Sequence, residues 1–357
     1  MSNLTAKRAE KSKINDVDWN NLRFGVYFSD HVFVSDFKNG KWDGGRIEPY
    51  SAMSVEPAMC TLHYGQTIFE GLKGFRSVKG GVNIFRPDMN AKRLNNSAKT
   101  LCIPEFDEKL FHEGLKELVK LEYDWIPKER GQSLYIRPVV YGSGNFLGVT
   151  ASQEYRLIIM LSPVASYYAE GLKPVKILVS KDYVRAVSGG VGNAKTAANY
   201  AASLKAGMEA HKNGYAQVLW LDGVTRKYVD EVGAMNIMFV IDNELITPCL
   251  DRGSILPGIT RMSVLHLARE WKMKVTEREI SIDEVSDAYD KGKLQEVFGT
   301  GTAAVISPVG FLKYGDKEMT INNNQIGPVA QKFYETITGI QYGEIEDKYG
   351  WILHIDV

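Results

Sequence analysis

The second half of the sequence alternates short apolar segments with segments of helical spacing, and this pattern limits the folds open to the chain. Apolar runs at 175–179, 217–221 and 236–241 are typical of buried strands, and 196–212 is typical of a helix. Such an alternation predicts a mixed α/β fold. At 357 residues the chain is long enough for two domains.

The first half contains further strand-like segments and one well-marked helix. We expect strands at 24–34, 82–85, 134–140 and 156–161, and a helix that Asp107 caps, with Phe111, Leu115 and Leu118 on one face. We therefore expect a small N-terminal domain at 1–164, an interdomain linker at 165–174 and a larger domain at 175–357. Residues 1–18 lack an apolar stretch that could serve as a signal peptide, and we expect a flexible lead-in there.

Charge and hydrophobicity exclude several classes of partner. Lysine plus arginine number 43, and so do aspartate plus glutamate, which gives a formal net charge of zero at pH 7. A chain without a net basic field is not steered toward nucleic acid or anionic membranes. No apolar run reaches the roughly eighteen residues that a membrane span needs. We therefore expect small-molecule partners, with no nucleic acid and no membrane.

The cysteines and histidines form no metal or redox pattern. Cys60, Cys102 and Cys249 are odd in number and include no CxxC pair, which suits a reducing compartment and predicts a cytoplasmic protein. We expect these three to be small buried residues. The six histidines show no metal-ligand spacing, so we expect no metal site.

Lys195 lies in a segment with very small side chains, which includes glycines at 189, 190 and 192. Glycines are expected where the backbone bends sharply or approaches another group closely. Small residues on both sides would let a flat ligand lie against the backbone while the amine reaches it. Partial desolvation would then favour the neutral amine that forms a Schiff base. The same residues also fit a glycine-rich surface loop with a solvated lysine.

Two further segments indicate backbone-rich turns. The segment 256–261 leads into an expected helix with Met262, Leu265 and Trp271 on its apolar side, and the free N–H groups at its start make an anion site. The segment 299–304 satisfies a permissive dinucleotide-binding pattern. Because 305–308 is typical of a strand and not of the helix that this pattern requires, we do not interpret it as a Rossmann signal.

Taken together, these blocks resemble the fold-type IV, pyridoxal-phosphate-dependent (class IV) aminotransferases, and within them the branched-chain-amino-acid aminotransferases. The resemblance runs from about Leu22 to the C-terminus. It is carried by the segments 24–31, 69–73, 85–87, 134–138, 195–200, 217–221, 231–236, 256–261 and 298–303. It implies a small α/β domain, a larger domain with a mixed barrel-like sheet, and reversible transfer of the amino group of L-leucine, L-isoleucine or L-valine to 2-oxoglutarate.

The resemblance also implies how pyridoxal 5'-phosphate is held. Lys195 would bind it as a Schiff base and then carry the proton at the substrate Cα. Glu231 would pair with the pyridine nitrogen, and Tyr200 would donate to the 3'-oxygen. The phosphate would be bound by charge, backbone N–H groups and hydroxyls, from Arg86, Ile259, Thr260 and Thr302.

For the substrate, the resemblance implies one pocket that accepts both an aliphatic side chain and the distal carboxylate of glutamate. Apolar walls and a polar group would come from Phe24, Tyr64, Phe69, Tyr135, Arg137 and Tyr167. Arg137 with Tyr64 would meet the distal carboxylate, and the α-carboxylate would sit on the turn at Thr302, Ala303 and Ala304. Leu147 and Val149 would come from the neighbouring subunit of a homodimer.

The sequence departs from the family pattern at a few positions. Ala234 stands where some relatives have a threonine, and Met238 where the class pattern prefers Phe or Tyr. A redox CxxC of some animal relatives is replaced by Ala304 and Ser307, so we expect no thiol switch of that kind. The alternatives are a D-amino acid aminotransferase or aminodeoxychorismate lyase of the same class, and a phosphate- or nucleotide-binding module without covalent chemistry.

Overall fold

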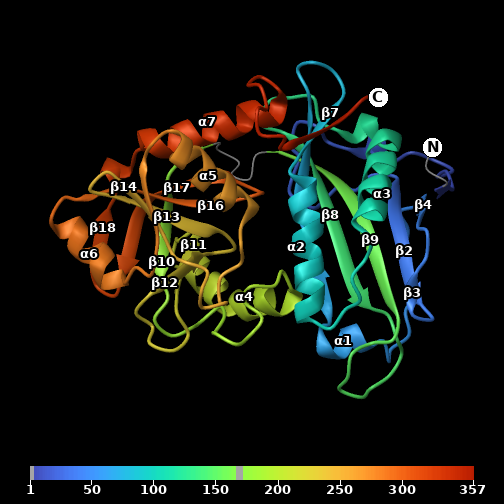
Figure 1. The fold of residues 1–357 in the computed structure, drawn as a ribbon, viewed down its shortest axis with the longest axis horizontal. Helices are drawn as coiled ribbons and strands as arrows, with labels where there is room; N and C mark the ends of the chain where they lie inside the picture. The colour runs from blue at the N-terminus through green and yellow to red at the C-terminus, as the bar shows by residue number, and fades with distance from the viewer. Residues whose placement is uncertain (1–3, 166–171) are drawn as a thin grey trace. The chain divides into compact units, whose positions relative to one another are not determined.

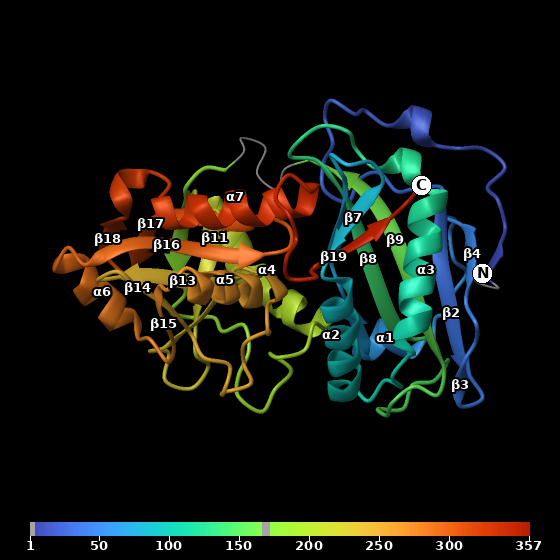
Figure 2. The same cartoon turned by 45° about the horizontal axis from the view of Figure 1, so that its top comes forward.

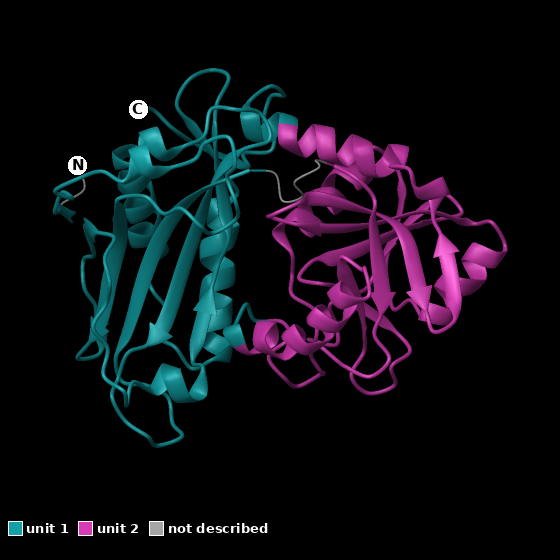
Figure 3. Cartoon of the chain, turned by 180° about the vertical axis from the view of Figure 1, so that it is seen from behind, with its two compact units in different colours: residues 1–169, 194–197, 339–357 teal, residues 170–193, 198–338 magenta. Residues whose placement is uncertain are grey.

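The computed structural model describes residues 4–165 and 172–357, which Figures 1 and 2 show in two orientations. Contacts between Cα atoms divide the chain into two units, coloured separately in Figure 3. The first unit contains Met1–Ala169, Ala194–Ala197 and Gly339–Val357, and the second contains Glu170–Asn193 and Ala198–Thr338. Lys195 therefore belongs to the first unit, although the glycines before it belong to the second.

The first unit is built on a sheet of ten strands among the described residues. Its strand pairs are antiparallel except for the parallel pair of β1 with β4. Along the sheet the order is β1 (Thr5–Ala6), β4 (Arg46–Pro49), β2 (His31–Lys38), β9 (Tyr155–Val164), β8 (Ser133–Gly142), β6 (Leu72–Arg76), β7 (Val82–Phe85) and β19 (Ile352–Ile355). Off this path, β3 (Lys41–Trp42) pairs with β2, and β5 (Thr67–Phe69) pairs with β8.

Helices α2 (Pro87–Thr100) and α3 (Glu108–Leu121) pack against this sheet (Figure 2). Asp107 caps α3, because its side chain accepts from the N–H of Lys109 at 2.9 Å. The expected apolar face of α3 is confirmed by Phe111, Leu115 and Leu118, which are all fully buried. The shorter helical segments of this unit are η1 (Ile14–Asp16), α1 (Cys60–Tyr64) and η2 (Tyr123–Trp125).

The second unit has a mixed sheet of nine strands among the described residues. The pairs of β10 with β11, β10 with β17, and β14 with β15 are parallel, and the others are antiparallel. The order is β12 (Val229–Val232), β11 (Gln217–Leu221), β10 (Val175–Val179), β17 (Val305–Tyr314), β16 (Leu294–Gly301), β13 (Asn236–Ile241), β14 (Glu244–Thr247) and β15 (Lys274–Glu277), and β18 (Lys317–Thr320) pairs with β17.

The remaining helices are α4 (Ala197–Lys212), α5 (Ile259–Glu270), α6 (Ile282–Asp290), η3 (Asn322–Asn324) and α7 (Pro328–Tyr342). Residues of β13, β16 and β17 form the apolar core of the second unit with Ile282 and Val285 of α6. The predicted α/β fold is thus confirmed. In the described part of the chain, no helix combines the length and the apolar character that crossing a membrane requires.

Several predicted elements agree with the structure, and two stretches differ from the prediction. The bounds of β7, β10, β11 and β13 are those predicted from the sequence. The strand predicted at 24–34 begins only at His31, because Gly25 has a positive φ of 69° within a turn. Residues 339–357, predicted in the larger domain, group with the first unit because β19 pairs with β7, Ile352 opposite Phe85.

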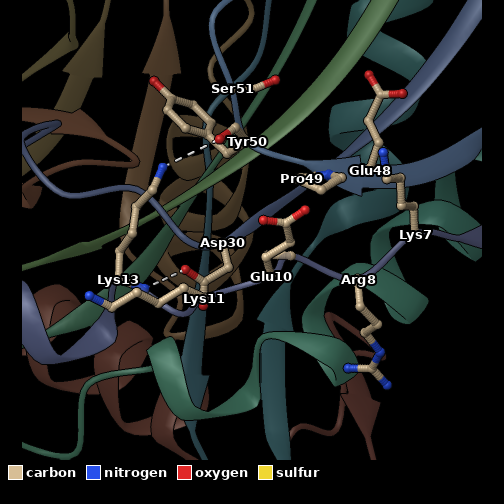
Figure 4. A pocket seen from close by; sticks show the side chains of 11 residues that line it. Lys7, Arg8, Glu10, Lys11, Lys13, Asp30, Glu48, Pro49, Tyr50 and Ser51 are labelled. Atoms are coloured by element: carbon tan, nitrogen blue, oxygen red, sulfur yellow. Dashed lines mark hydrogen bonds between the residues drawn. The ribbon is translucent and has the colours of Figure 1, made fainter.

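The segment 4–18, expected to be a flexible lead-in, makes specific hydrogen bonds to the first unit. The backbone N–H of Lys13 donates to Oδ1 of Asp30 at 2.7 Å, and its Nζ donates to the carbonyl of Tyr50 at 3.3 Å (Figure 4). The N–H of Ala9 donates to Nε2 of His31 at 2.8 Å. The segment also lines a pocket with the residues labelled in Figure 4, and none of these is a predicted site residue.

Candidate active site

The backbone of Lys195 is held between strand β5 and helix α2. Its carbonyl accepts from the N–H of Phe69 at 3.0 Å, and its N–H donates to Oγ of Ser97 at 2.9 Å. The next residue, Thr196, is fully buried, and its hydroxyl donates to the carbonyl of Thr67 at 2.7 Å. The side chain of Lys195 therefore extends from a hydrogen-bonded backbone, and the residue is not part of a solvated surface loop.

Five of the predicted site residues lie together, Lys195 among them. The Nζ of Lys195 is 5.0 Å from the ring centroid of Phe69, and Cζ of Arg137 is 4.7 Å from the same centroid. Nη2 of Arg137 donates to the hydroxyl of Tyr135 at 3.2 Å, and the ring of Tyr135 makes an edge contact with Phe24 at 4.7 Å. Two cations and three aromatic rings thus form one group, which suits an anionic ligand with an apolar part.

One donor in this group has no partner within the described part of the chain. Nε of Arg137 is buried and has no hydrogen-bond partner among the described residues. A buried donor without a partner is costly, so such groups mark sites where a ligand or water supplies the acceptor. The guanidinium presents a fork that matches a carboxylate. The geometry therefore fits recognition of a small carboxylate beside the aromatic rings.

Arg86 begins α2 with a strained backbone. Its φ is 50° and its ψ 46°, a left-handed conformation that is uncommon outside glycine, and such outliers cluster at ligand sites. Its N–H donates to the carbonyl of Trp351 at 2.7 Å, and Cζ lies 5.1 Å from the ring centroid of that tryptophan. Burial lowers the pKa of Arg86, although Asp88 and Asp347 act in the opposite direction. The C-terminal segment thus positions this arginine.

Tyr64, Leu147 and Val149 are exposed side chains of the first unit. The hydroxyl of Tyr64 donates to the carbonyl of Leu147. The side chains of Leu147 and Val149 are 63% and 88% exposed, so these apolar residues are not part of the core of the chain. Tyr167 lies outside the described residues.

In the second unit, Glu231 on β12 is buried and held by two neighbours. Nε of Arg185 lies 2.8 Å from Oε2 of Glu231, and Nδ2 of Asn236 donates to Oε1 at 3.0 Å. The same amide donates to the carbonyl of Leu256 at 2.9 Å, which links the carboxylate to the loop before α5. An arginine and an amide donor favour the charged form of a carboxylate, so Glu231 presents a fixed negative charge.

Helix α5 begins at Ile259, and its first N–H groups have no partner within the helix itself. Gly258 is the N-cap residue and supplies no side-chain cap, and Ile259 and Thr260 are the first two helical residues. A Cβ at position 258 would overlap Oδ1 of Asn236, so only glycine fits beside that amide. The helix start therefore offers N–H groups to an anion.

The turn between β16 and β17 is the second backbone-rich element of this unit. Thr302, Ala303 and Ala304 are half-buried, and Val305 after them has a φ of 62°, which is strained for a β-branched residue. Oγ1 of Thr300 is buried and has no hydrogen-bond partner among the described residues. Tyr200, on the first turns of α4, is half-buried.

Pyridoxal 5'-phosphate fits the chemistry of these residues. The group carries an aldehyde, a pyridine nitrogen and a phosphate, which call for an amine, a carboxylate and anion donors. The first unit contains an amine at Lys195 and a guanidinium at Arg86, and the second unit contains a buried carboxylate at Glu231 and the N–H groups at the start of α5. The orphaned hydroxyl of Thr300 adds a buried polar atom next to the turn.

Sequence reasoning missed Arg185 and Asn236, which hold Glu231. Asn236 lies within the family-like segment 231–236, where its proximity to Glu231 was available as a signal. Arg185 is separated from Glu231 by 46 positions and belongs to no motif, so only the fold reveals it. The sequence also did not reveal why residue 192 is glycine. A Cβ at this position would overlap the carbonyl of Ser254.

The departures from the family pattern occupy two kinds of environment. Ala234 is exposed, while Met238 is fully buried on β13, opposite Phe298.

The cysteines were expected to be buried, and this is wrong for Cys102, which is exposed at a positive φ of 54°. Cys60 is buried, and Cys249 is intermediate.

Comparison with known proteins adds independent findings. The family model described as amino-transferase class IV matches residues 67–310. Branched-chain-amino-acid aminotransferase 2 of Bacillus subtilis (strain 168) is 55% identical over 339 residues, which cover 95% of this chain and 93% of the relative.

Solved structures agree with this similarity. The crystal structure of the Escherichia coli branched-chain amino acid aminotransferase has a TM-score of 0.73 at 30% identity, and the match covers 89% of this chain and 98% of that one. The branched-chain amino acid aminotransferase of T.th., solved with N-(5'-phosphopyridoxyl)-L-glutamate, has a TM-score of 0.71 at 28% identity, and this match covers 90% of this chain and 98% of that one.

Proposed function

The chain belongs to the class IV aminotransferases, as a branched-chain-amino-acid aminotransferase, and we propose that Lys195 holds its cofactor. The enzyme transfers the amino group of L-leucine, L-isoleucine or L-valine reversibly to 2-oxoglutarate and uses pyridoxal 5'-phosphate. The observation that carries the assignment of Lys195 is its fixed backbone and its amine beside Phe69. A D-amino acid aminotransferase or aminodeoxychorismate lyase is not favoured at 55% identity to a branched-chain enzyme.

Lys195 carries the proton of the reaction. When bound, pyridoxal 5'-phosphate supplies an electron sink for the electrons left on the substrate Cα. With the cofactor bound, the Lys195 amine would take the proton from the substrate Cα and deliver it to C4' of the cofactor, and it would move the proton in the opposite direction in the reverse half-reaction. Its backbone bonds to Phe69 and Ser97 keep the amine in one place through both transfers.

Glu231 would pair with the pyridine nitrogen and favour its protonated form. Arg185 and Asn236 fix the carboxylate and favour its charged form, and this charge in turn favours the protonated ring. Tyr200 would donate to the 3'-oxygen. The phosphate would be bound by Arg86, by the N–H groups at Ile259 and Thr260, and by the hydroxyl of Thr302.

The substrate side uses the aromatic and cationic group around Lys195. Phe24, Phe69 and Tyr135 provide apolar contact for a branched side chain. Arg137, with its unpartnered Nε and its bond to Tyr135, meets the distal carboxylate when glutamate or 2-oxoglutarate is the substrate. The α-carboxylate is bound by backbone N–H groups of Thr302, Ala303 and Ala304. Tyr64 and Tyr167 complete the proposed set.

We also propose that the enzyme is a cytoplasmic homodimer in which Leu147 and Val149 reach the site of the neighbouring subunit. The support is the exposure of these two apolar side chains, whose exposed fractions are 63% and 88%. Large apolar side chains that are this exposed favour a surface that a partner covers. Sedimentation equilibrium tests the dimer. Leu147→Asp together with Val149→Asp should weaken the dimer and lower activity in parallel, whereas a monomer of full activity would refute this part of the proposal.

One absorption experiment tests cofactor and substrate class together. The purified protein should show the visible band of bound cofactor, and L-leucine without any keto acid should abolish that band. Lys195→Ala should lose the covalent attachment and turnover, and Glu231→Gln should keep the cofactor bound but slow turnover. A band that ignores L-leucine and responds to D-alanine would favour the D-amino acid alternative, and full activity of Lys195→Ala would end the proposal.

A further inference from the structure

A buried carboxylate, Glu70, directly follows the phenylalanine that contacts Lys195. Its exposed fraction is 0%. Nε of Arg93 donates to Oε1 at 2.7 Å and Nη2 to Oε2 at 2.9 Å, and Nδ2 of Asn90 donates to Oε2 at 2.6 Å. A charge removed from water is costly unless it is paired and hydrogen-bonded, and here both oxygens have partners. The first unit thus holds Glu70 as a buried, paired carboxylate.

Lys195 acts on the charge of Glu70. Burial raises the pKa of Glu70, but the charges of Arg93 and Lys195, with the hydrogen bonds from Arg93 and Asn90, hold it below its ordinary value. The interaction is mutual, because a cation that stabilises a carboxylate is stabilised by it to the same extent. The charges of Glu70 and Lys195 are therefore coupled.

The same ion pair connects the two elements that hold the backbone of Lys195. Glu70 follows β5, whose Phe69 donates to the Lys195 carbonyl, and Arg93 belongs to α2. Ser97, one turn further along α2, accepts from the Lys195 N–H at 2.9 Å and donates to the Arg93 carbonyl at 3.0 Å. The pair of Glu70 and Arg93 thus fixes the spacing of the two supports.

We propose that Glu70 is a positioning residue of the aminotransferase reaction, which orders Lys195 through Arg93 and Ser97 and stabilises the protonated amine by its charge. The inference rests on the proposed role of Lys195. Glu70 is fully buried, so its charge acts on the amine of Lys195 more strongly than the charge of an exposed carboxylate would. Besides Glu70, the charged and titratable groups on β6, α2 and β8 are Lys73, Arg76, Asp88, Lys92, Arg93, Lys99, Tyr135, Arg137 and Tyr141. The charge of Lys195 acts on the carboxylate of Glu70, whereas Asp88 lies at the start of α2 and acts on Arg86.

The first test measures the amine of Lys195 directly. In the enzyme treated with L-leucine alone, Lys195 is released, and its rate of acylation by an amine-directed reagent is followed by peptide mass spectrometry. Only the neutral amine reacts, so Glu70→Gln should raise the rate about tenfold at a fixed pH below about 9, because the protonated form loses its stabilising charge. In the cofactor-bound enzyme, the midpoint of the pH titration of the visible band should move to lower pH.

Arg93→Gln tests the same buried charge through its partner. Without the arginine, burial drives the Glu70 carboxylate toward its neutral form, so the acylation rate should rise as it does in Glu70→Gln. This second variant also keeps the proposal testable if Glu70→Gln does not fold. Glu70→Asp retains the charge and should restore a rate near that of the unmodified enzyme.

Asp36→Asn is the matched control. Asp36 is a carboxylate of the same sheet that pairs with Arg156 at 2.6 Å and Arg46 at 3.1 Å, and its partners lie on β9 and β4, away from the supports of Lys195. This variant should leave the acylation rate and the titration midpoint unchanged. Equal results for Glu70→Gln and Asp36→Asn would overturn the inference. The proposed function fails separately, if Lys195→Ala still attaches the cofactor covalently.

Discussion

The N–H of Phe69 donates to the carbonyl of Lys195 at 3.0 Å, while the ring centroid of Phe69 lies 5.0 Å from Nζ of the same lysine. Cζ of Arg137 is 4.7 Å from that centroid. Phe69 therefore supports the backbone of the proposed cofactor lysine and contacts the cations of both the lysine and the proposed substrate arginine.

Phe69→Leu should lower kcat/KM for both amino donors about tenfold. The backbone bond to Lys195 survives the change, but two cation–π contacts of about 0.5–1 kcal/mol each are lost. Steady-state kinetics with L-leucine and L-glutamate measure the effect. Phe75→Leu is the control, because Phe75 is buried in β6 against Tyr342 at 4.9 Å and should affect stability with little change in kcat/KM. Equal kinetic losses in both variants would contradict the prediction.

Arg137→Met should separate the two substrate classes. A hydrogen bond to a charged group contributes about 1.5–3 kcal/mol, so kcat/KM for 2-oxoglutarate should fall roughly 10- to 100-fold. The half-reaction with L-leucine, whose side chain carries no charge, should change by less than about threefold. Stopped-flow spectroscopy of each half-reaction gives the two values. A uniform loss for both substrates would mean that Arg137 acts on the fold and not on the distal carboxylate.

The sequence predicted elements well where hydrophobic periodicity was strong and local. Strands β11 and β13 are almost entirely buried apolar runs, and α3 has both a cap and a regular apolar face. The segment 24–30 has the composition of a strand, but Gly25 turns the chain before the sheet begins. Composition reports the preference of a segment for extended backbone, whereas pairing requires a neighbour that composition does not reveal.

The candidate site shows the same division between motif and fold. Lys195, Glu231 and Arg137 lie in short segments typical of the family, so the sequence alone supplied them as hypotheses. Arg185 became visible only through its contact with Glu231, because it lies in no such segment and charged residues are mostly solvated. Grouping 339–357 with the first unit likewise depends on the long-range pairing of β19 with β7.

Mild oxidation should leave the activity unchanged. The positions of a redox CxxC in some animal relatives are occupied by Ala304 and Ser307, which cannot form a disulfide. Of the three cysteines, Cys102 is exposed, and burial raises the pKa of Cys249, which disfavours its reactive thiolate. Activity is measured after hydrogen peroxide treatment with and without reductant. Loss that a reductant reverses would contradict the prediction, and Cys102→Ser would then identify the thiol.

Asp230 should make the stability of the second unit depend on pH. Its side chain is buried on β12, and burial raises its pKa from 3.8 to about 6, although Ser254 and Arg185 oppose the shift. The folded state binds this proton more tightly than the unfolded state, so the protonated Asp230 stabilises the fold. This stabilisation is fully present below pH 3.8 and is lost as the pH rises through about 6.

The variant Asp230→Asn isolates that contribution. Between pH 8 and pH 5 the linkage relation gives the unmodified protein about 1.4 kcal/mol of stability from this group, which the variant lacks. Urea unfolding gives the free energy of unfolding of the variant minus that of the unmodified protein. This difference should be about 1.4 kcal/mol more positive at pH 8 than at pH 5. Asp283→Asn, at the start of α6, is the control and should give the same difference at both values. If Asp230→Asn instead shifted stability equally at pH 5 and pH 8, the carboxyl of Asp230 would not titrate in this range, and burial would not be what governs its protonation.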